Sequence, residues 1–512
     1  MKKFQKAIQA ASALALSLLL AACGTSPAPS ESEKDASQAS SPVSAGETAA
    51  EEDKTLKILR SYIATKEEDE NAIQALSEGT GYTLEFSFLP EKNPLDKLNL
   101  MFSGGDMEYD YIMLGASDQD KSSFASYAKK GLLKDITEMI PSRANLAKVD
   151  PLCFDALKAD GKIYGVGSTG LPVTKTASFI RADWLDTLQL KAPTTRDELY
   201  EVLKAFHEQD PGGNGADNIP FCASDGWVTA ITSTYGIVYP YEDRDGKIVD
   251  TRTLPEFKEY LAFMNRLYSE GLLDQDMPIN TGASQHEKIA AGKVGFYCGW
   301  VDDAKDLLIA KHEEKQEGSF MEAFEPLQGP DGTKKAQSDR GLFGIGMIPA
   351  SSPKAEAVLD YIDTYLQPDN FESIIHGKEG VDYEIKDGVK IPTDAFNTNR
   401  GAMSGYFPLQ DGDAYYDMWL LRTRKVPEYD TIYTKLAETN NPYQVSSVLA
   451  YAPSFETVSQ ESKSVTEYAS QEMIKFIAGA RDIGEFDQFV EEMNAHGSDK
   501  ILDAYNEWYT AQ

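Results

Sequence analysis

Cationic residues, histidine and cysteine are all scarce in this 512-residue sequence, and each shortage excludes a class of protein. Lysine and arginine total 49 against 82 aspartates and glutamates, a net charge of −33. Binding to nucleic acid, or to anionic lipid by charge, needs clustered cations, so neither function is expected. Four cysteines are too few for a disulfide scaffold. The five histidines lack metal-ligand spacing, and the motifs H-E-x-x-H and G-x-S-x-G are missing.

The N-terminus carries the most specific signal. Residues 1–22 contain three lysines and then an apolar run of about 16 residues, shorter than the ~20 that a spanning helix needs. A basic region before a short apolar run is typical of an export signal. The segment ends Leu20-Ala21-Ala22-Cys23-Gly24, which resembles a bacterial lipobox. We therefore expect a lipoprotein signal peptide over 1–22 and a lipid on Cys23. The alternative is a buried apolar helix with a chance cysteine.

Residues 23–54 are rich in Ser, Ala, Pro and Glu. Such a stretch cannot bury enough apolar surface to offset the entropy of ordering, so we predict a disordered tether. Loss of residues 1–22 would leave 46 basic and 82 acidic residues, a net charge of −36. The remaining Cys153, Cys222 and Cys298 allow at most one disulfide; alternatively, all three are small buried apolar residues.

Strand and helix patterns alternate from residue 55 onward. The predicted order is strand 56–63, helix 66–77, strand 82–88, helix 95–102 and strand 109–114. This order predicts an α/β fold with a parallel sheet. Ligands bind beyond the carboxyl ends of such strands. This rule places Tyr62, Asp118 and Gln119 near a candidate site.

Helical periodicity continues later in the chain. Thr195 and Glu198 have the spacing of a helix capping box. The apolar residues of 199–206 and 257–268 each fall on one helix face, which predicts core positions. Two further amphipathic helices are expected over 485–508. We find no repeat with a period of 20–50 residues.

Two tryptophans are candidate ligand platforms. Trp227 and Trp300 follow strand-like segments and lie in glycine-rich loops beside Asp225 and Asp302. An aromatic face beside a carboxylate suits the C–H face and hydroxyls of a sugar. Core packing is the alternative for both tryptophans.

A glycine-rich loop from Asp210 to Asn218 has some features of a calcium site. Asp210, Asn214 and Asp217 supply oxygen atoms, and Gly215 stands at the position of the sharp turn. Gly212 offers no side-chain oxygen, and the loop has no glutamate at position twelve. A plain turn is the alternative.

Taken together, several segments resemble the extracellular solute-binding proteins of family 1, the carbohydrate-type receptors of ABC importers. The resemblance extends to lipoprotein members from Gram-positive bacteria and to alginate-oligosaccharide-binding relatives. It covers about residues 55–512. The segments that carry it are Gly131–Thr137, Gly161–Val166, Ile180–Asp186, Pro193–Phe206, the Asp210 loop, Gly292–Gly295, Gly377–Tyr383 and Asn506–Tyr509.

The resemblance implies a two-lobed, periplasmic-binding-protein-like fold of type II with a hinge. The N-terminal lobe would hold residues 55–175 with about 296–345, and the C-terminal lobe 176–295 with about 346–512. Ligand would lie between the lobes, and the expected ligand-binding residues are Tyr62, Asp118, Gln119, Trp227, Tyr235, Trp300 and Asp302. Family members often hold calcium in the loop corresponding to Asp210, so calcium is the one cofactor expected.

The implied function is a lipid-anchored receptor on the outer face of a Gram-positive cell membrane. It would be monomeric and non-catalytic, and it would deliver an oligosaccharide to ABC-transporter permease subunits. Three alternatives stay open: a receptor for peptides or another small solute, a surface-anchored enzyme acting on polysaccharides, and a receptor that signals through a membrane partner and feeds no importer.

Overall fold

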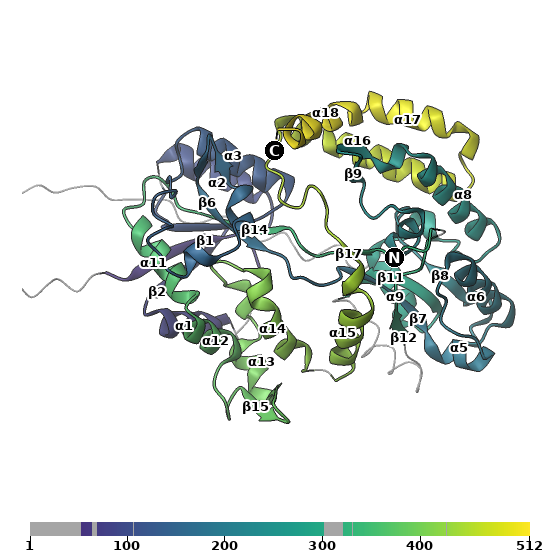
Figure 1. Cartoon of the computed structure of the whole chain (residues 1–512), viewed down its shortest axis with the longest axis horizontal. Coiled ribbons are helices and arrows are strands. Elements are labelled where there is room, and N and C mark those ends of the chain that lie inside the picture. Colours follow the sequence, from purple (N-terminus) through teal and green to yellow (C-terminus); the bar gives the residue numbers. More distant parts are fainter. Residues whose placement is uncertain are drawn as a thin grey trace, which may run out of the picture. The chain divides into compact units, whose positions relative to one another are not determined.

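A computed structural model describes residues 53–63, 69–105, 107–301, 321–329, 331–425 and 427–511. These residues fold around two β-sheets, each flanked by helices (Figure 1). The predicted signal peptide, Cys23, residues 23–52 of the predicted tether, and Asp302 lie outside the described residues.

The first sheet has the strand order β2-β1-β3-β14-β6. Its strands are β1 (Thr55–Arg60), β2 (Thr83–Phe88), β3 (Tyr111–Gly115), β6 (Gly165–Thr169) and β14 (Leu342–Met347). The first three are parallel, as the alternating pattern predicted, whereas β14 runs antiparallel to both β3 and β6. The sheet is therefore mixed, because β14 arrives from far along the chain.

Side-chain alternation along these strands divides the helices between the two faces. Leu56 and Ile58 pack into the same core as α1 (Asp69–Thr80), α11 (Ala355–Tyr365) and α12 (Pro368–His376). Leu59 points to the opposite face and packs with α2 (Pro94–Gly104) and α3 (Asp118–Lys129).

The second sheet has the order β12-β7-β11-β8. Its strands are β7 (Thr176–Arg181), β8 (Ile219–Cys222), β11 (Val294–Trp300) and β12 (Met321–Phe324). Because β8 and β11 are parallel, both end at one edge of the sheet, where the antiparallel β7 begins. One face packs against α5 (Ala182–Leu188), α6 (Arg196–Gln209), α8 (Pro255–Ser269), α16 (Glu456–Ile477) and α17 (Phe486–Ala495).

The buried face of α6 confirms the sequence prediction, since Leu199, Val202, Leu203 and Phe206 are all buried. The predicted capping box is half formed. The Thr195 hydroxyl accepts the Glu198 N–H at 3.2 Å. The Glu198 carboxylate, however, accepts from the backbone and hydroxyl of Thr194 at 2.7 Å instead of from Thr195.

The assignment of late segments to the two sheets differs from the sequence interpretation. Residues 296–345 were expected with the first sheet, but β11 and β12 pair with β7 in the second, and only β14 joins the first. Residues 346–512 were expected with the second sheet, but α11 and α12 pack on the first. Strand pairing over long separations causes the difference, because hydrophobic patterns do not state which sheet a strand joins.

Extended segments connect the two sheets and are hydrogen-bonded to one another. Thr174 forms an antiparallel bridge with Ser338, and β13 (Ala336–Gln337) pairs with β17 (Gln444–Val445). The side-chain oxygen of Asn441 accepts both the N–H and the hydroxyl of Thr174, at 3.0 and 3.1 Å. Three passages of the chain therefore run side by side where the sheets connect.

Short helices and hairpins complete the described chain. The helices are α4 (Leu152–Asp155), α7 (Thr229–Thr232), α9 (Gly282–Ala290), α13 (Asp394–Arg400), α14 (Gly412–Thr423), α15 (Pro427–Thr439) and α18 (Ser498–Tyr509). The hairpins are β4 (Lys158–Ala159) with β5 (Lys162–Ile163), β9 (Tyr241–Arg244) with β10 (Lys247–Asp250), and β15 (Tyr383–Lys386) with β16 (Val389–Pro392). Helices α17 and α18 confirm the predicted C-terminal pair. Within the described ranges, no helix has the length and apolar character to cross a bilayer.

Candidate functional site

A cavity of about 630 Å³ opens at the edge of the second sheet where β8 and β11 end. Trp227 and Trp300 both line this tryptophan cavity, as do Cys222 and Cys298. The polar side chains on its wall come from Thr176, Ser224, Asp225, Thr229, Gln285, His286, Tyr297 and Gln337. Pockets of this size, with aromatic walls and a few polar groups, are typical ligand sites.

The loop after β8 is held in place from behind by two helices. The Tyr260 hydroxyl of α8 donates to the Gly226 carbonyl at 2.7 Å and accepts the Val228 N–H at 3.0 Å. Gly226 also packs closely on α16, where an added Cβ would lie 2.7 Å from the Cβ of Met473. The loop that carries Asp225 and Trp227 is therefore a fixed wall.

The two tryptophans differ in how freely their rings are presented. The Trp227 ring stacks on Phe257 with centroids 5.5 Å apart and planes at 29°. Trp300, the last residue of β11, is 56% exposed, and the Lys175 ammonium lies 5.0 Å from its ring centroid. Trp227 is thus braced by the core, whereas Trp300 offers an open aromatic surface.

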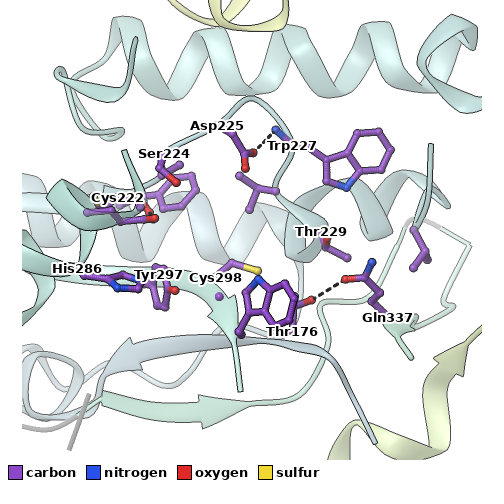
Figure 2. Close-up of a pocket in the computed structure, with 18 of the residues that line it drawn as sticks. Thr176, Cys222, Ser224, Asp225, Trp227, Thr229, His286, Tyr297, Cys298 and Gln337 are labelled. Atoms are coloured by element: carbon purple, nitrogen blue, oxygen red, sulfur yellow. Dashed lines mark hydrogen bonds between the residues drawn. The ribbon is translucent and has the colours of Figure 1, made fainter. Parts of the chain in front are cut away.

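Figure 2 shows the polar groups arranged around the cavity. Asp225 lies on the opposite side from His286 and Tyr297, and Gln337 lies near Thr176. The Asp225 carboxylate accepts the backbone N–H of Trp227 at 2.7 Å, and the Thr176 hydroxyl donates to Gln337 at 3.4 Å. Asp225 is exposed at the cavity mouth, and desolvation by the surrounding wall raises its pKa above the ordinary value.

The three cysteines within the described residues, Cys153, Cys222 and Cys298, are free thiols. Cys222 faces Tyr297 across the β8–β11 pair, so Cys298, one residue further on, points to the other face of the sheet. This alternation prevents a disulfide between them. Burial raises the pKa of the Cys298 thiol to about 12 and that of Cys153 to about 12. These thiols are therefore protonated near neutral pH, in keeping with small apolar residues.

The other predicted ligand residues lie elsewhere. Tyr62 is 49% exposed beyond the end of β1. Asp118 and Gln119 occupy the exposed first turn of α3, and Asp118 lines a separate hollow of about 180 Å³ with Phe455 and Tyr505. Tyr235 packs in the core under the Arg196 guanidinium, 4.2 Å from its ring centroid. Of the predicted residues that the structure describes, Trp227 and Trp300 are brought together.

Sequence reasoning missed several groups on the wall of the tryptophan cavity. Asp225 was noted beside Trp227 in the sequence but was not among the expected ligand residues, and Ser224, three residues before Trp227, was not named although its proximity could have marked it. Thr229, His286 and Gln337 carried no such signal, because β-sheet pairing and helix packing bring them in from distant segments.

A smaller hollow of about 190 Å³ lies at the first sheet, at the ends of β1 and β3. It is lined by Arg60, Ser168, Phe343 and Gln410, among others. Phe343 is 64% exposed and lies at a β-bulge between Leu342 and Gly344 of β14. Tyr62 and Asp118 were expected at this edge, but neither lines the hollow.

The Asp210 loop, as folded, does not fit a calcium site. The Asp210 carboxylate accepts the N–H groups of Asn214 and Gly215 at 2.9 and 2.8 Å. Asp217 pairs with the Lys293 ammonium at 2.8 Å. Across the described residues, no cluster of three or more His, Cys, Asp and Glu side chains could hold a metal ion. Calcium at this loop therefore stays a prediction from the sequence, without support from the geometry.

Comparison with known proteins defines the class. The model of the bacterial extracellular solute-binding protein family matches residues 63–370, and the chain belongs to this family. The fold agrees with that of alginate-binding protein AlgQ2 solved without calcium, with a TM-score of 0.65, 20% identity and coverage of 89% of this chain and 98% of that one. The Streptococcus pneumoniae protein FusA in complex with kestose gives a TM-score of 0.65 at 22% identity, with coverage of 90% of this chain and 99% of that one.

Curated relatives extend over most of the chain. The polygalacturonan/rhamnogalacturonan-binding protein YtcQ of Bacillus subtilis is 28% identical over 450 residues, which cover 86% of this chain and 88% of that protein. Lipoprotein LipO of the same species is 25% identical over 477 residues, 89% and 92% of the two chains. The fructooligosaccharide substrate-binding protein FusA of Streptococcus pneumoniae is 29% identical over 366 residues, which cover 66% of this chain and 64% of that protein.

Proposed function

We propose that this chain is the substrate-binding receptor of an ABC importer and that it binds an oligosaccharide in the tryptophan cavity. The observation that carries the proposal is that Trp227 and Trp300 line the same cavity, together with hydroxyl, amide and carboxylate side chains. Relatives named for fructooligosaccharide and for polygalacturonan or rhamnogalacturonan support a carbohydrate. Those names leave open whether the sugar is neutral or acidic.

The chemistry of a sugar matches this wall. Indole rings are large, flat and apolar, so they cover the C–H face of a pyranose or furanose. The hydroxyls at the ring edge need hydrogen-bond partners once water is excluded. Ser224, Thr229 and Asp225 lie on the wall to provide them.

We propose that the linked extended segments around Thr174, Ser338 and Val445 act as the hinge. They are hydrogen-bonded neighbours. Small concerted changes in their backbone angles would therefore rotate one sheet relative to the other. Hinge closure is a standard way to enclose a ligand. The receptor would work without catalysis, as a monomer held by lipid on Cys23 at the outer face of the membrane, and would pass its ligand to permease subunits.

Thermal-shift and calorimetric binding with a panel of solutes test this function. Oligosaccharides, tripeptides and other small solutes would each be tried with and without calcium. A ligand at 100 times its dissociation constant stabilises the folded state by about 2.7 kcal/mol. We expect shifts with one sugar class. Shifts with peptides alone would favour the solute-receptor alternative, and products formed during long incubation would favour an enzyme.

Substitution of Trp300 tests the placement of the site. We expect Trp300→Ala to weaken binding about tenfold, equivalent to about 1.4 kcal/mol, with little change in melting temperature because the side chain is 56% exposed. Trp227→Ala should lower both affinity and stability, since its ring stacks on Phe257. Leu100→Ala, on α2 and 69% exposed, is the matched control. Unchanged affinity in both tryptophan variants would contradict the placement.

A further inference from the structure

The described residues that line the tryptophan cavity carry fixed charge of one sign, which is negative. Of the described residues that line it, Asp225 is the one carboxylate, and none is lysine or arginine. The remaining polar groups are hydroxyls, amides, thiols and the His286 imidazole. A ligand group placed among them meets one fixed negative charge and no fixed positive charge from this part of the chain.

Asp225 is placed to contact a ligand. One carboxylate oxygen accepts the Trp227 N–H, and no further hydrogen bond to the carboxylate is found among the described residues. The neighbouring hydroxyls of Ser224 and Thr229 likewise make no side-chain hydrogen bond within the described ranges. Figure 2 shows Asp225 between Ser224 and Trp227, on a loop that Tyr260 fixes from behind.

Two lysines close to lining residues of this wall, Lys175 and Lys288, are already paired with carboxylates. The Lys175 ammonium, which lies over the Trp300 ring, is 3.7 Å from Asp339. The Lys288 ammonium, behind Cys222, bonds both Asp274 and Asp276, at 2.7 and 3.0 Å. Neither lysine therefore brings an uncompensated positive charge that would offset Asp225.

We infer that the sugar unit held in the tryptophan cavity carries no carboxylate, and that Asp225 is the residue that selects neutral over acidic oligosaccharides. This inference rests on the proposed function and specifies its substrate class. A carboxylate accepts hydrogen bonds from sugar hydroxyls, and such charge-assisted bonds are stronger than neutral ones. The same carboxylate repels a uronate in a site where water is excluded, and repulsion of the wrong ligand is an established source of specificity.

The test compares neutral and acidic probes on the purified chain by calorimetry. The neutral probes are nystose, cellotetraose and β-1,4-galactotetraose, and the acidic probe is tetragalacturonate. The neutral probe that binds tightest is then oxidised at its primary alcohols to give a carboxylate-bearing counterpart. We expect the wild-type chain to bind the neutral form about a hundredfold or more tightly than the oxidised form.

Asp225→Asn isolates the role of the charge, because asparagine keeps an acceptor for the Trp227 N–H. We expect this variant to reduce the ratio of neutral to oxidised affinity by about tenfold. Asp245→Asn, in the β9–β10 turn at a positive φ of 56° that asparagine tolerates, should keep the wild-type ratio. Melting temperatures of both variants confirm that they are folded.

The outcomes separate this inference from the proposed function. Binding of tetragalacturonate or of the oxidised probe as tightly as any neutral probe would overturn the inference and leave the carbohydrate receptor standing. A ratio unchanged in Asp225→Asn would also overturn it. If no sugar probe, acidic or neutral, binds measurably, the result would instead contradict the proposed function.

Discussion

His376 is a buried imidazole in a charged setting. It ends α12 and is 6% exposed. Its Nδ1 atom lies 2.7 Å from the Lys390 ammonium and 3.7 Å from the Glu372 carboxylate, and its ring meets Tyr383 edge-on. Burial first, and then the positive charges of Lys390 and Arg424, lower its pKa from 6.5 to about 4 despite Glu372. The imidazole is therefore neutral in the folded protein at pH 7.

This residue predicts a loss of stability in mild acid. The folded-state pKa lies below the unfolded value, so the unfolded chain takes up the proton first. The stabilisation is complete above about pH 6.5 and is lost as the pH falls toward 4, a change on the order of 3 kcal/mol. We expect His376→Gln to flatten this part of a curve of unfolding free energy against pH, measured in urea.

Other groups titrate in the same range, so a second histidine provides the control. His207 is exposed on α6, and His207→Gln should keep the wild-type slope. An equal slope in His376→Gln and wild type would show that the imidazole does not contribute.

At the scale of elements, β14 shows how one irregular strand changes what a sheet presents. It lies between β3 and β6 and is antiparallel to both. The bulge between Leu342 and Gly344 interrupts its pairing with β6. Bulges re-aim side chains and are common beside binding sites. Here the bulged residue is Phe343, whose ring is exposed above the hollow lined by Arg60 and Gln410.

We expect Phe343 to contribute to ligand binding from the first sheet. Phe343→Ala should weaken binding of the oligosaccharide found in the panel by about three- to tenfold. Its melting temperature should stay near wild type, because the ring is 64% exposed. Ile385→Ala, 52% exposed on β15, is the control. Calorimetric affinities equal to wild type in Phe343→Ala would remove the first sheet's hollow from the binding site.

At the scale of the whole molecule, the proposed lipid anchor at Cys23 would decide where the receptor works. The described residues account for the folded body, and the proposed anchor at Cys23 precedes them. The net charge of −33 favours solubility and gives no electrostatic attraction to anionic lipid. Stable attachment would therefore depend on covalent lipid, whose chains partition into the bilayer.

Metabolic labelling with an alkyne fatty acid tests the anchor. We expect the wild-type chain to take up the label and Cys23→Ser to lose it completely. Cys153→Ser, which changes a buried thiol in the body, should label as the wild type does. Label retained in Cys23→Ser would show that lipid is attached elsewhere or that the lipobox is not used.

Much of the fold could be predicted because its signals are local. The strands at 55–60, 83–88 and 111–115 and the apolar face of α6 follow from the periodicity of neighbouring residues. Part of the candidate site was also accessible, since Trp227 follows β8 in the sequence and Trp300 is the last residue of β11. Tyr235 stays a prediction as a ligand residue: it ends a short 3-10 helix, packs under Arg196 and meets Tyr260 edge-on, and no local sequence pattern indicates this packing.

The alternation of strands and helices, the export-like N-terminus and the acidic charge follow from the sequence alone, because each depends on composition or on residues a few positions apart. That β11 and β12 belong to the second sheet, and that Asp225, His286 and Gln337 share one cavity, became visible in the folded chain. These groups are far apart along the chain. Their meeting depends on strand register and helix packing, which are set by many weak contacts acting together and by no single motif.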